Sequence, residues 1–446
     1  MPVVEFVGQS GRDSDNVQAN TSRLINLYRE PTTGGKTVLK SVLGMTPHSG
    51  LDGVFIRAMG EFWGTHYAVC GGWVWEVTPD GSANPLFEVI DSVETTLSSN
   101  GQDVITVAAG GTYYVWDGSA ATEPTGGAFD AVSSVEFLDH YTLLTEKDGR
   151  RFQWTDVADP ETLDGLNFTT ADGADDLIIR GMALSGHYWV FKQKSHEIWY
   201  NTGGPGADAF ARVQGMVRNT GLAGFNLIAK LPDAAFMIGS DGRAHLIAGG
   251  IVKPVSTPPV ETAIKDCRPV SVLTYEDEGH TFCAIILRDC PAWVFDVATG
   301  EWHERAEGAT LRPWNVQCSA KVGATWFLGR NTGEISRLTR SNADGIEPLV
   351  REATSATLTL DGARFVTREL EFFPRQGVSS GSVWLSLSRD GGMTWTPNKT
   401  LPLGGVGGYG KRLIARNLGQ SRMLTARLRW SAPADVTFST EARVVV

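Results

Sequence analysis

Carboxylate pairs are the side chains in this sequence that come nearest to a catalytic arrangement. Asp175 and Asp176 are adjacent, and Glu276, Asp277 and Glu278 form a second acidic run. Two carboxylates that flank a glycosidic bond act as acid and base, or as acid and nucleophile, in glycoside hydrolysis. However, neighbouring residues of a strand point to opposite faces of a sheet. We therefore interpret both clusters as solvated loop tips.

Other catalytic and metal-binding patterns do not occur in the sequence. The eight histidines form neither H-E-x-x-H nor H-x-H. There is no G-x-S-x-G, and the run GGVGGYGKR (404–412) lacks the ending of a P-loop, so it is interpreted as a turn. The five cysteines show no C-x-x-C spacing, and neither a disulfide framework nor a zinc site is expected. The sequence thus predicts no catalytic residues, no metal site and no cofactor.

The stretch SLSRDGGMTW (386–395) matches the Asp box, S-x-D-x-G-x-T-W, and resembles the boxes of sialidases and related propeller proteins. Its residues have folding roles: the carboxylate accepts turn amides, the glycines allow unusual backbone angles, and the tryptophan packs beneath the hairpin. A sialidase would carry several boxes, whereas this chain has one full copy, placed after its repeats. The predicted structural set is Ser388, Asp390, Gly391, Gly392 and Trp395.

Strand-turn-strand units recur along the chain before this box. Equivalent points are Trp75, Trp116, Trp154, Trp199, Leu246 and Phe295, which are 41, 38, 45, 47 and 49 residues apart. Four short strands need roughly 40 to 50 residues, which is the size of one propeller blade. The spacing predicts a β-propeller of about six or seven blades. A set of β-sandwiches with accidental spacing is the alternative.

Turn chemistry agrees with this interpretation. Asp-Gly occurs ten times, whereas 27 Asp and 51 Gly in random order would give about three pairs. The excess indicates many tight hairpins, because Gly tolerates positive φ and Asp bonds its own backbone. The nearest helix candidates, ADAFARVQGMVRN (207–219) and PPVETAIKD (258–266), are both short. The predicted fold class is therefore all-β.

The rhythm changes at both ends of the predicted propeller. Residues 346–446 contain longer alternating strands, which predict a β-sandwich-like platform domain. Residues 1–50 are polar apart from the short apolar run LINLY, and are interpreted as an N-terminal arm. The arm would pack on the platform or on a neighbouring copy. The propeller is assigned to residues 51–345.

Charge is distributed unevenly along the chain. The net charge is −11, yet residues 351–446 hold 13 Lys and Arg against 7 Asp and Glu, a balance of +6 that leaves −17 for the rest. Such asymmetry can steer the basic domain onto an acidic part of another copy, although solvated strand faces would give the same composition. The overall acidity argues against a sequence-reading nucleic-acid binder. Neither a membrane span nor an N-terminal signal segment is expected.

Four separated segments together resemble one protein family. They are RLINLYREP (23–31), PVSTPPVETAI (254–264), the Asp box, and LPLGGVGGYGKRLIARNLGQSRMLTARLRWS (401–431). In this order and spacing they are similar to the tail nozzle, or tail hub, proteins of short-tailed bacteriophages (podoviruses), which include packaged-DNA stabilisation proteins. The resemblance covers nearly the whole chain. It implies a propeller with an additional β-rich platform.

The resemblance also implies a structural virion protein of the phage tail, made in the host bacterial cytoplasm, and not an enzyme. Such proteins form a homo-hexameric ring below the portal and its adaptor, the head-to-tail connector ring. The ring extends the channel for packaged double-stranded DNA, helps retain that DNA before ejection, and carries fibres or tailspikes and a tail plug or needle. DNA would pass through the lumen without sequence-specific binding. A sialidase-like glycosidase or depolymerase, and a lectin-like propeller, are the alternatives.

Basic and aromatic residues at both ends of the chain are the candidates for contacts between subunits. The arm and the C-terminal domain would join neighbouring copies, partly through charge. Each of these side chains could equally be a half-buried or solvated strand residue. The candidate interface set is Arg23, Tyr28, Arg29, Arg389, Tyr409, Lys411, Arg412, Arg416 and Arg422.

Overall fold

The computed structural model describes residues 3–8, 10–11, 22–431 and 436–446 of the chain. The described elements are almost all strands, which confirms the all-β fold class; the helical exceptions among them are α1 (Pro258–Asp266) and the 3₁₀ turn η2 (Gly206–Asp208). The chain forms two compact units that do not follow chain order. The sandwich unit comprises Met1–Thr46, Asp277–Trp314 and Leu338–Val446, and the propeller unit comprises Pro47–Glu276 and Asn315–Arg337.

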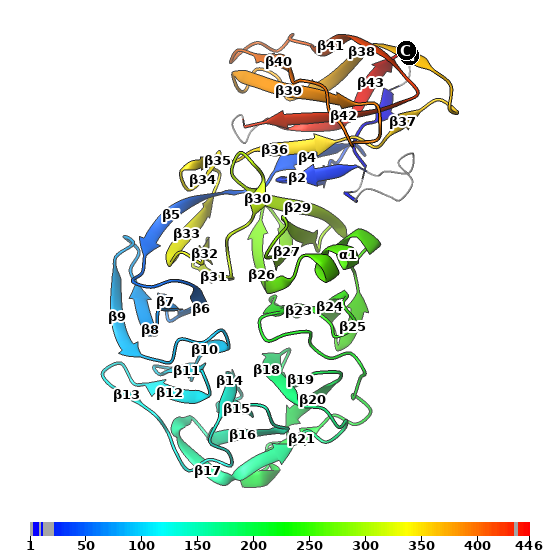
Figure 1. The fold of residues 1–446 in the computed structure, drawn as a ribbon. Helices are drawn as coiled ribbons and strands as arrows, with labels where there is room; N and C mark the ends of the chain where they lie inside the picture. The colour runs from blue at the N-terminus through cyan, green and yellow to red at the C-terminus, as the bar shows by residue number, and fades with distance from the viewer. Residues whose placement is uncertain (1–2, 9, 12–21, 432–435) are drawn as a thin grey trace. The chain divides into compact units, whose positions relative to one another are not determined.

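Five four-stranded antiparallel sheets, each made from consecutive strands, dominate the propeller unit (Figure 1). We call them the first to fifth blades. The first two are β6 (Ile56–Phe62), β7 (Thr65–Cys70), β8 (Trp73–Val77), β9 (Ala83–Glu88), and β10 (Thr95–Ser99), β11 (Ile105–Ala109), β12 (Thr112–Trp116), β13 (Ala121–Thr122). The next two are β14 (Val132–Leu138), β15 (Tyr141–Glu146), β16 (Arg151–Asp156), β17 (Asp159–Thr170), and β18 (Ile178–Leu184), β19 (His187–Lys192), β20 (His196–Asn201), β21 (Phe210–Arg212). The fifth is β22 (Ile228–Lys230), β23 (Ala234–Ile238), β24 (Ala244–Ala248), β25 (Ile251–Pro254).

From the first to the fourth blade, the first strand of each blade packs against the first strand of the next. Contacts run from β31 (Cys318–Val322) to β6, and then to β10, β14 and β18. Strand β31 pairs with β32 (Thr325–Gly329), which pairs with β33 (Glu334–Thr339), so the unit holds a sixth sheet of the same type. This arrangement of inner first strands is that of a propeller. Three of the four boundaries between the units fall within β5 (Gly44–Gly50), β26 (Pro269–Asp277) and β33, and the fourth, between Trp314 and Asn315, follows β30 (Arg312–Pro313).

Side chains point alternately to the two faces of each strand, and this explains why the blades stack on both faces. In β11, Ile105, Val107 and Ala109 contribute to the apolar cluster shared with the first blade. Ala108, which points to the opposite face, contributes to the cluster shared with the third blade. Because both faces of a middle blade are covered, its strands read as nearly continuous apolar runs.

Asp-Gly turns close many of the hairpins, as the sequence predicts. Between β12 and β13, the Asp117 carboxylate accepts the backbone amides of Ser119 and Ala120, both at 2.8 Å. Gly118 follows with φ of +96°, a conformation that side chains disfavour. The Asp-Gly pair thus supplies both the hydrogen-bond acceptor and the conformational freedom of the turn.

Two sheets form the sandwich unit. The order of the first is β3 (Leu27–Pro31), β4 (Thr37–Ser41), β43 (Phe438–Val445), β38 (Phe365–Pro374) and β41 (Leu413–Ser421), with β1 (Val3–Glu5) paired to β43. Within the unit, the second runs β27 (His280–Leu287), β28 (Ala292–Asp296), β29 (Glu301–Glu307), β2 (Arg23–Ile25), β36 (Arg351–Thr354), β42 (Met423–Trp430), β39 (Gly381–Ser388) and β40 (Lys399–Gly404). Of the short strands, β30 (Arg312–Pro313) pairs with β29 and β37 (Leu358–Thr359) with β42, while β34 (Ala343–Asp344) and β35 (Glu347–Pro348) belong to the sheet of β31, β32, β33 and β5.

The N-terminal strands are integral to this sandwich. β2 pairs antiparallel with β36, and both β1 and β4 pair with β43 near the end of the chain. Leu24, Leu27 and Leu39 share one buried apolar cluster with Leu385 and Leu428 of the second sheet. Since residues 12–21 lie outside the described residues, the arm that the sequence predicts is described here only on either side of them.

The repeat pattern locates one particular strand of each blade. Trp75, Trp116, Trp154, Trp199 and Leu246 lie in β8, β12, β16, β20 and β24, the third strands of their blades. Phe295 lies in β28, the middle strand of the antiparallel set β27–β29 in the sandwich unit.

One of the two helix candidates forms an α-helix and the other does not, and the expectation about disulfides is corrected. The segment 258–266 forms α1, whereas 207–219 begins with η2 and continues into β21. Cys267 and Cys290 are disulfide-bonded, contrary to the expectation of no disulfide, while the other three cysteines are free. The odd number and irregular spacing of the cysteines gave no signal for this bond.

Candidate functional site

The Asp box forms the turn that follows β39. The Ser388 hydroxyl donates to Asp390 Oδ1 at 2.6 Å and accepts the amide of Gly392 at 2.7 Å. Asp390 also accepts the amide of Thr394 on Oδ1 at 2.9 Å and its hydroxyl on Oδ2 at 2.5 Å. Gly391 and Gly392 have φ of +72° and +101°. The box therefore closes its turn with its own polar groups.

Electrostatic contacts also hold the Asp box in place. Hydrogen bonds from Ser388 and Thr394 hold the pKa of Asp390 well below its usual range. Trp395 is half-buried, and the Arg427 guanidinium of the neighbouring β42 lies 4.0 Å from its ring centroid. Such a cation–π contact fixes the indole on the sheet. Because both carboxylate oxygens bond to the turn, the geometry is that of a fold-stabilising device.

Beyond this turn, the sandwich presents two edge strands. β40 ends one sheet, β41 ends the other, and the two strands contact each other. The loop that joins them carries Val406 and Tyr409, which are 78% and 73% exposed. It is an ordered turn, since Gly407 donates its amide to the Gly377 carbonyl at 2.9 Å. We call β40, β41 and this loop the basic edge.

A groove of about 390 Å³ lies on the basic edge and brings three of the candidate cations together. Arg412 binds Glu371 through two hydrogen bonds, both of 2.6 Å, and Arg416 Nε donates to Glu369 Oε1 at 2.9 Å. The guanidinium of Arg412 lowers the pKa of Glu371. The arginine side chains still remain 52% and 62% exposed. The groove is lined by Leu401, Pro402, Gly410, Lys411, Arg412, Leu413, Ile414 and Arg416.

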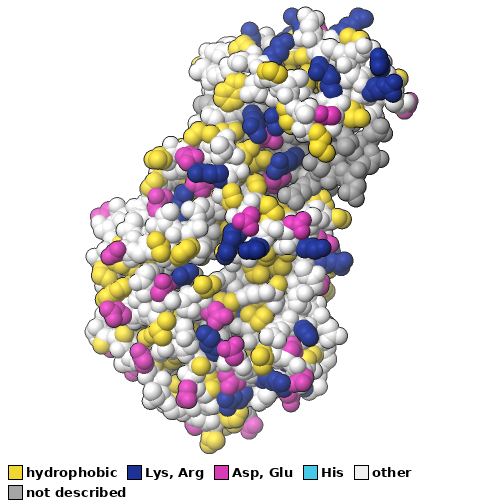
Figure 2. Space-filling view, in the orientation of Figure 1, with side chains coloured by type: hydrophobic (Ala, Val, Ile, Leu, Met, Phe, Trp, Pro, Cys, Tyr) yellow, Lys and Arg dark blue, Asp and Glu magenta, His cyan; other side chains and the backbone are white. Residues whose placement is uncertain are grey.

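Two acidic residues of this site are absent from the candidate set derived from the sequence. Glu369 and Glu371 are two apart in β38, so both side chains stand on one face of the strand, beside β41. The alternation in RELEFF (368–373) is the signal that would have identified them. In contrast, Arg389 and Arg422 lie towards the other end of β41, where Arg389 donates to the Leu418 carbonyl at 2.8 Å. On the face drawn in Figure 2, Lys and Arg predominate among the charged side chains of the sandwich.

The N-terminal candidates have partners inside the sandwich unit. Arg23 binds Glu304 through two hydrogen bonds of 2.6 and 2.7 Å, and Glu304 is only 2% exposed. Arg29 donates to Glu301 at 3.1 Å and to Glu5 at 3.3 Å. These arginines hold the N-terminal strands to the sheets of their own chain.

Tyr28 is a correction to the candidate interface set. Its side chain is 1% exposed and packs against the rings of His280 and Phe282, each with centroids 5.2 Å away. Burial raises the pKa of its hydroxyl. In this conformation Tyr28 is a core residue, so a neighbouring subunit cannot reach it.

Asn26 explains much of the RLINLYREP segment. Its side-chain amide donates to the carbonyls of Ala306 and Val350, and its Oδ1 accepts Arg305 Nη1 at 2.9 Å. Arg305 in turn binds Asp344 at 2.6 Å, and both side chains are buried. Buried polar groups of this kind almost always have at least one hydrogen-bond partner. The polar positions of the segment thus bond to the unit, while Leu24 and Leu27 fill its core.

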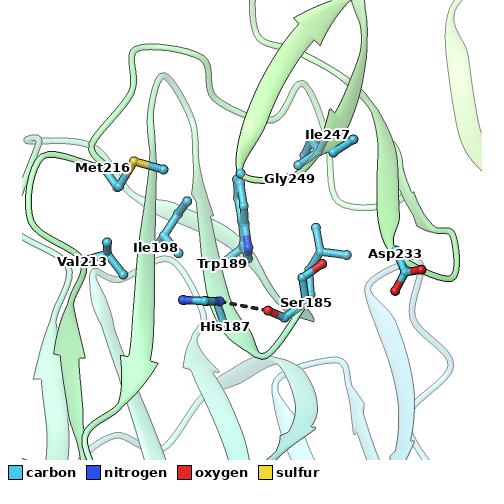
Figure 3. Close-up of a pocket in the computed structure, with 12 residues that line it drawn as sticks. Ser185, His187, Trp189, Ile198, Val213, Met216, Asp233, Ile247 and Gly249 are labelled. Carbon is cyan, nitrogen blue, oxygen red and sulfur yellow. Dashed lines mark hydrogen bonds between the residues drawn. The ribbon is translucent and has the colours of Figure 1, made fainter.

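The propeller unit has a separate pocket of about 290 Å³ between the fourth and fifth blades (Figure 3). Its walls are mainly apolar, including Trp189, Ile198 and Ile247. His187 Nδ1 lies 2.9 Å from the Ser185 carbonyl, and Asp233 comes from a different turn. The lining contains one carboxylate, whereas glycoside hydrolysis uses two. The pocket therefore lacks the donor set of a glycosidase.

Within the described ranges, no three His, Cys, Asp or Glu side chains are grouped so as to hold a metal ion. The helices of the described chain include none with the length and apolar character needed to cross a membrane.

Two family models match the chain and together span most of it. Residues 6–340 match the model described as bacteriophage P22 Gp10, beta-propeller. Residues 351–445 match the model described as bacteriophage P22 Gp10, beta-sandwich. Both descriptions agree with the two kinds of sheet described above. Among curated protein sequences, none matches the chain.

Solved structures of low sequence identity are also similar. The RRP9 WD40 repeats have a TM-score of 0.46 at 10% identity, covering 67% of this chain and 99% of theirs. The computationally designed Ika8 protein has 0.43 at 14%, covering 74% and 99%. PorZ, a bacterial surface component of the type-IX secretion system of Porphyromonas gingivalis, has 0.41 at 10%, covering 72% and 44%.

The family matches decide between the interpretations that the sequence leaves open. They agree with the resemblance to phage tail nozzle proteins in both the propeller and the sandwich, and nothing in them supports a glycosidase or a lectin. The chain belongs to the bacteriophage P22 Gp10 family, and is thus a structural tail nozzle and DNA-stabilisation protein of a short-tailed phage virion.

Proposed function

We propose that six copies of this chain stand side by side below the portal and its adaptor ring. The ring continues the DNA channel outward, retains the packaged genome until ejection, and carries fibres or tailspikes and a plug or needle. The protein is made in the host bacterial cytoplasm and acts in the virion. One observation carries this proposal: the family match extends through both the propeller and the sandwich.

The distribution of charge supports a role as a conduit. The propeller unit has 17 Lys and Arg against 30 Asp and Glu, a net charge of −13, whereas the sandwich unit has +2. Proteins hold DNA mainly through cations on phosphates, and each such contact strengthens binding. An acidic wall would therefore let double-stranded DNA slide without sequence-specific binding.

The roles of the three segments of the chain are part of the same proposal. Residues 1–50 act as an arm and residues 346–446 as the platform that joins neighbouring copies. Residues 51–345 supply the propeller and, through Asp277–Trp314, part of the sandwich unit. The arm and platform share the paired strands β4 and β43, which supports a joint role in assembly. Lys411, Arg412 and Arg416 would take part in subunit docking, because their side chains are exposed on the basic edge.

We further propose that the protein has no catalytic role. The propeller pocket offers a single carboxylate, and the Asp box uses its carboxylate within its own turn. Purified protein incubated with polysaccharide from the surface of the host should release no reducing sugar. Release that rises with protein concentration would contradict this part of the proposal.

Copy number tests the proposed assembly. The full chain is mixed with the adaptor ring of the same phage, and the mass of the complex is measured by native mass spectrometry. Six copies per adaptor ring are expected, while the chain alone can remain monomeric. A complex with another copy number, or no complex, would overturn the proposal.

A further inference from the structure

The strongest unassigned feature of the propeller unit is an acidic surface on its first three blades. Residues 58–146 contain 13 Asp and Glu and not one Lys or Arg, and residues 152–179 contain seven Asp and Glu, again with no Lys or Arg. The acidity of the unit is thus concentrated in one part of the chain. A surface with one sign of charge attracts a partner of the opposite sign.

The outer strands of these blades expose many of the acids. Glu88 ends β9, Glu123 follows β13, and Glu161 and Asp164 belong to the long β17; all four are exposed. Because β9, β13 and β17 are the last strands of their sheets, each leaves an open edge. We call these three strands and the residues that flank them the acidic rim.

The rim is continuous between the second and third blades. The Thr122 hydroxyl donates to Glu161 at 2.8 Å, and the Tyr113 hydroxyl donates to the Pro160 carbonyl at 2.8 Å. β13 and the start of β17 therefore lie side by side. Exposed apolar side chains accompany the carboxylates, since Leu166 is 73% exposed and Val157 is 60% exposed.

The basic edge of the sandwich has the complementary composition. It presents Lys411 with the half-exposed Arg412 and Arg416, and its loop exposes Tyr409 and Val406. Each guanidinium has five N–H donors, of which the bonds to Glu369 and Glu371 use one or two. The remaining donors can bind incoming carboxylates. Tyr and Arg are also the residue types that most often dominate binding energy at interfaces.

We propose that the basic edge of one copy docks on the acidic rim of a second copy. Lys411, Arg412 and Arg416 face rim carboxylates, and the Tyr409 ring packs against the exposed apolar side chains of β17. The contact joins two different surfaces, so repeating it produces a head-to-tail series that closes into a ring or continues as a filament. This inference rests on the proposed nozzle assembly and adds the two surfaces that hold its subunits together.

Two charge-reversal variants test the pairing. The edge variant is Lys411→Glu with Arg416→Glu, and the rim variant is Glu88→Lys with Glu123→Lys. These side chains are exposed, and the rim pair leaves the Asp-capped turns intact. The control for the edge variant, Arg288→Glu with Arg364→Glu, makes the same change of charge as that variant at exposed sites outside the groove.

Ring yield is measured by native mass spectrometry on the adaptor ring of the same phage. Each test variant alone should reduce the yield of complete rings by about tenfold or more, because like charges then meet at every contact. An equimolar mixture of the two variants should restore rings, since in an alternating ring every edge meets a rim of opposite charge. The control variant should assemble as wild type does.

The outcomes separate this inference from the nozzle assembly itself. If the edge variant forms as many complete rings as wild type, or if the mixture forms no more rings than either variant alone, the two proposed surfaces are wrong. The nozzle assembly itself would still stand, because wild type forms rings. Failure of the wild-type chain to form rings would overturn both. As a second readout, a carbodiimide couples Lys411 to a rim carboxylate in a mixture of ¹⁵N-labelled and unlabelled chains. Mixed-isotope cross-links are expected, whereas links only within single chains would contradict docking between copies.

Discussion

Asp390 stabilises the Asp-box turn through its charge, and this makes the turn sensitive to pH. Hydrogen bonds from Ser388 and Thr394 depress its pKa in the folded protein. A depressed pKa stabilises the fold above the unfolded value of about 3.9, and that contribution is lost as the pH falls towards the folded value. Asp390→Ala should therefore lower the Tm of the protein at pH 7, and the difference from wild type should shrink below about pH 4.

Thermal unfolding followed by circular dichroism at pH 3 to 7 measures this effect. Asp390→Asn is the matched control, because it keeps an oxygen acceptor for the Thr394 amide and should lose less. A difference between wild type and Asp390→Ala that is the same at every pH would show that charge plays no part.

Arg23 and Arg29 lie in one segment but should differ in their contribution to stability. Glu304 is 2% exposed and accepts two hydrogen bonds from Arg23, so removing Arg23 leaves a buried carboxylate without this partner. Because an unpaired buried carboxylate is costly and Arg23 is itself partly exposed, Arg23→Ala should reduce the free energy of unfolding by about 1 to 3 kcal/mol. Arg29→Ala should cost less than about 1 kcal/mol, since its partners Glu5 and Glu301 are 61% and 22% exposed and can be solvated once the arginine is removed. Urea unfolding of both variants checks the order, and equal losses would contradict it.

Candidate interface residues near the chain ends could be chosen from the sequence by their type, but their burial could not be predicted. Tyr28 and Tyr409 look alike as polar aromatics, yet one is 1% and the other 73% exposed. The difference arises from pairing between residues hundreds of positions apart, as between β4 and β43. Local patterns carry no information on such pairing. The Asp box is the opposite case, since its bonds join residues 388 to 394 and follow from the motif itself.

At the scale of elements, Asp-Gly turns of the same type should differ in their tolerance of a side chain. Gly81 and Gly118 each follow an Asp and have φ of +90° and +96°. A Cβ at Gly118 meets nothing within 4 Å, so Gly118→Ala should cost only the backbone strain of about 1 to 2 kcal/mol. At Gly81 it would come 2.2 Å from the His48 carbonyl oxygen, so Gly81→Ala should cost more. Chemical unfolding of both variants tests this, and equal effects would contradict the steric argument.

Strand identity was predictable where turns and alternation repeat. Five equivalent positions of the recurring units, four tryptophans and one leucine, all fall on third strands, because a blade of fixed design repeats a large apolar side chain there. The edge strands were not predictable in the same way. Whether β40 and β41 end their sheets depends on what pairs with their neighbours, and Glu369 and Glu371 become part of the groove only through that topology.

At the scale of the whole molecule, the charge distribution predicts weak binding to DNA. With a net charge of −13 on the propeller unit, the chain should bind double-stranded DNA no more tightly than roughly 10⁻⁴ M at physiological salt, the weak end of non-specific binding. Fluorescence anisotropy with a labelled duplex, at 50 and 200 mM salt, measures this. The edge variant Lys411→Glu with Arg416→Glu should remove residual low-salt binding, because those cations lie on the basic edge. Tight, strongly salt-dependent binding by wild type would contradict a sliding channel.

The family could be inferred from four short segments, whereas the organisation into two units could not. The sandwich unit draws on three separate parts of the chain, and no change in composition marks its middle part, Asp277–Trp314. Repeat patterns in the sequence are read in chain order, whereas a compact unit is defined by which strands pair in space. A division of the chain into consecutive domains is therefore the natural first expectation from sequence alone.

Electron microscopy of the full chain assembled on its adaptor ring would show whether six copies surround a DNA channel. A sixfold tube that continues the channel of the adaptor is expected, with one propeller and one sandwich in each subunit. Particles in which the chain is absent, or is arranged without sixfold symmetry around a channel, would contradict it.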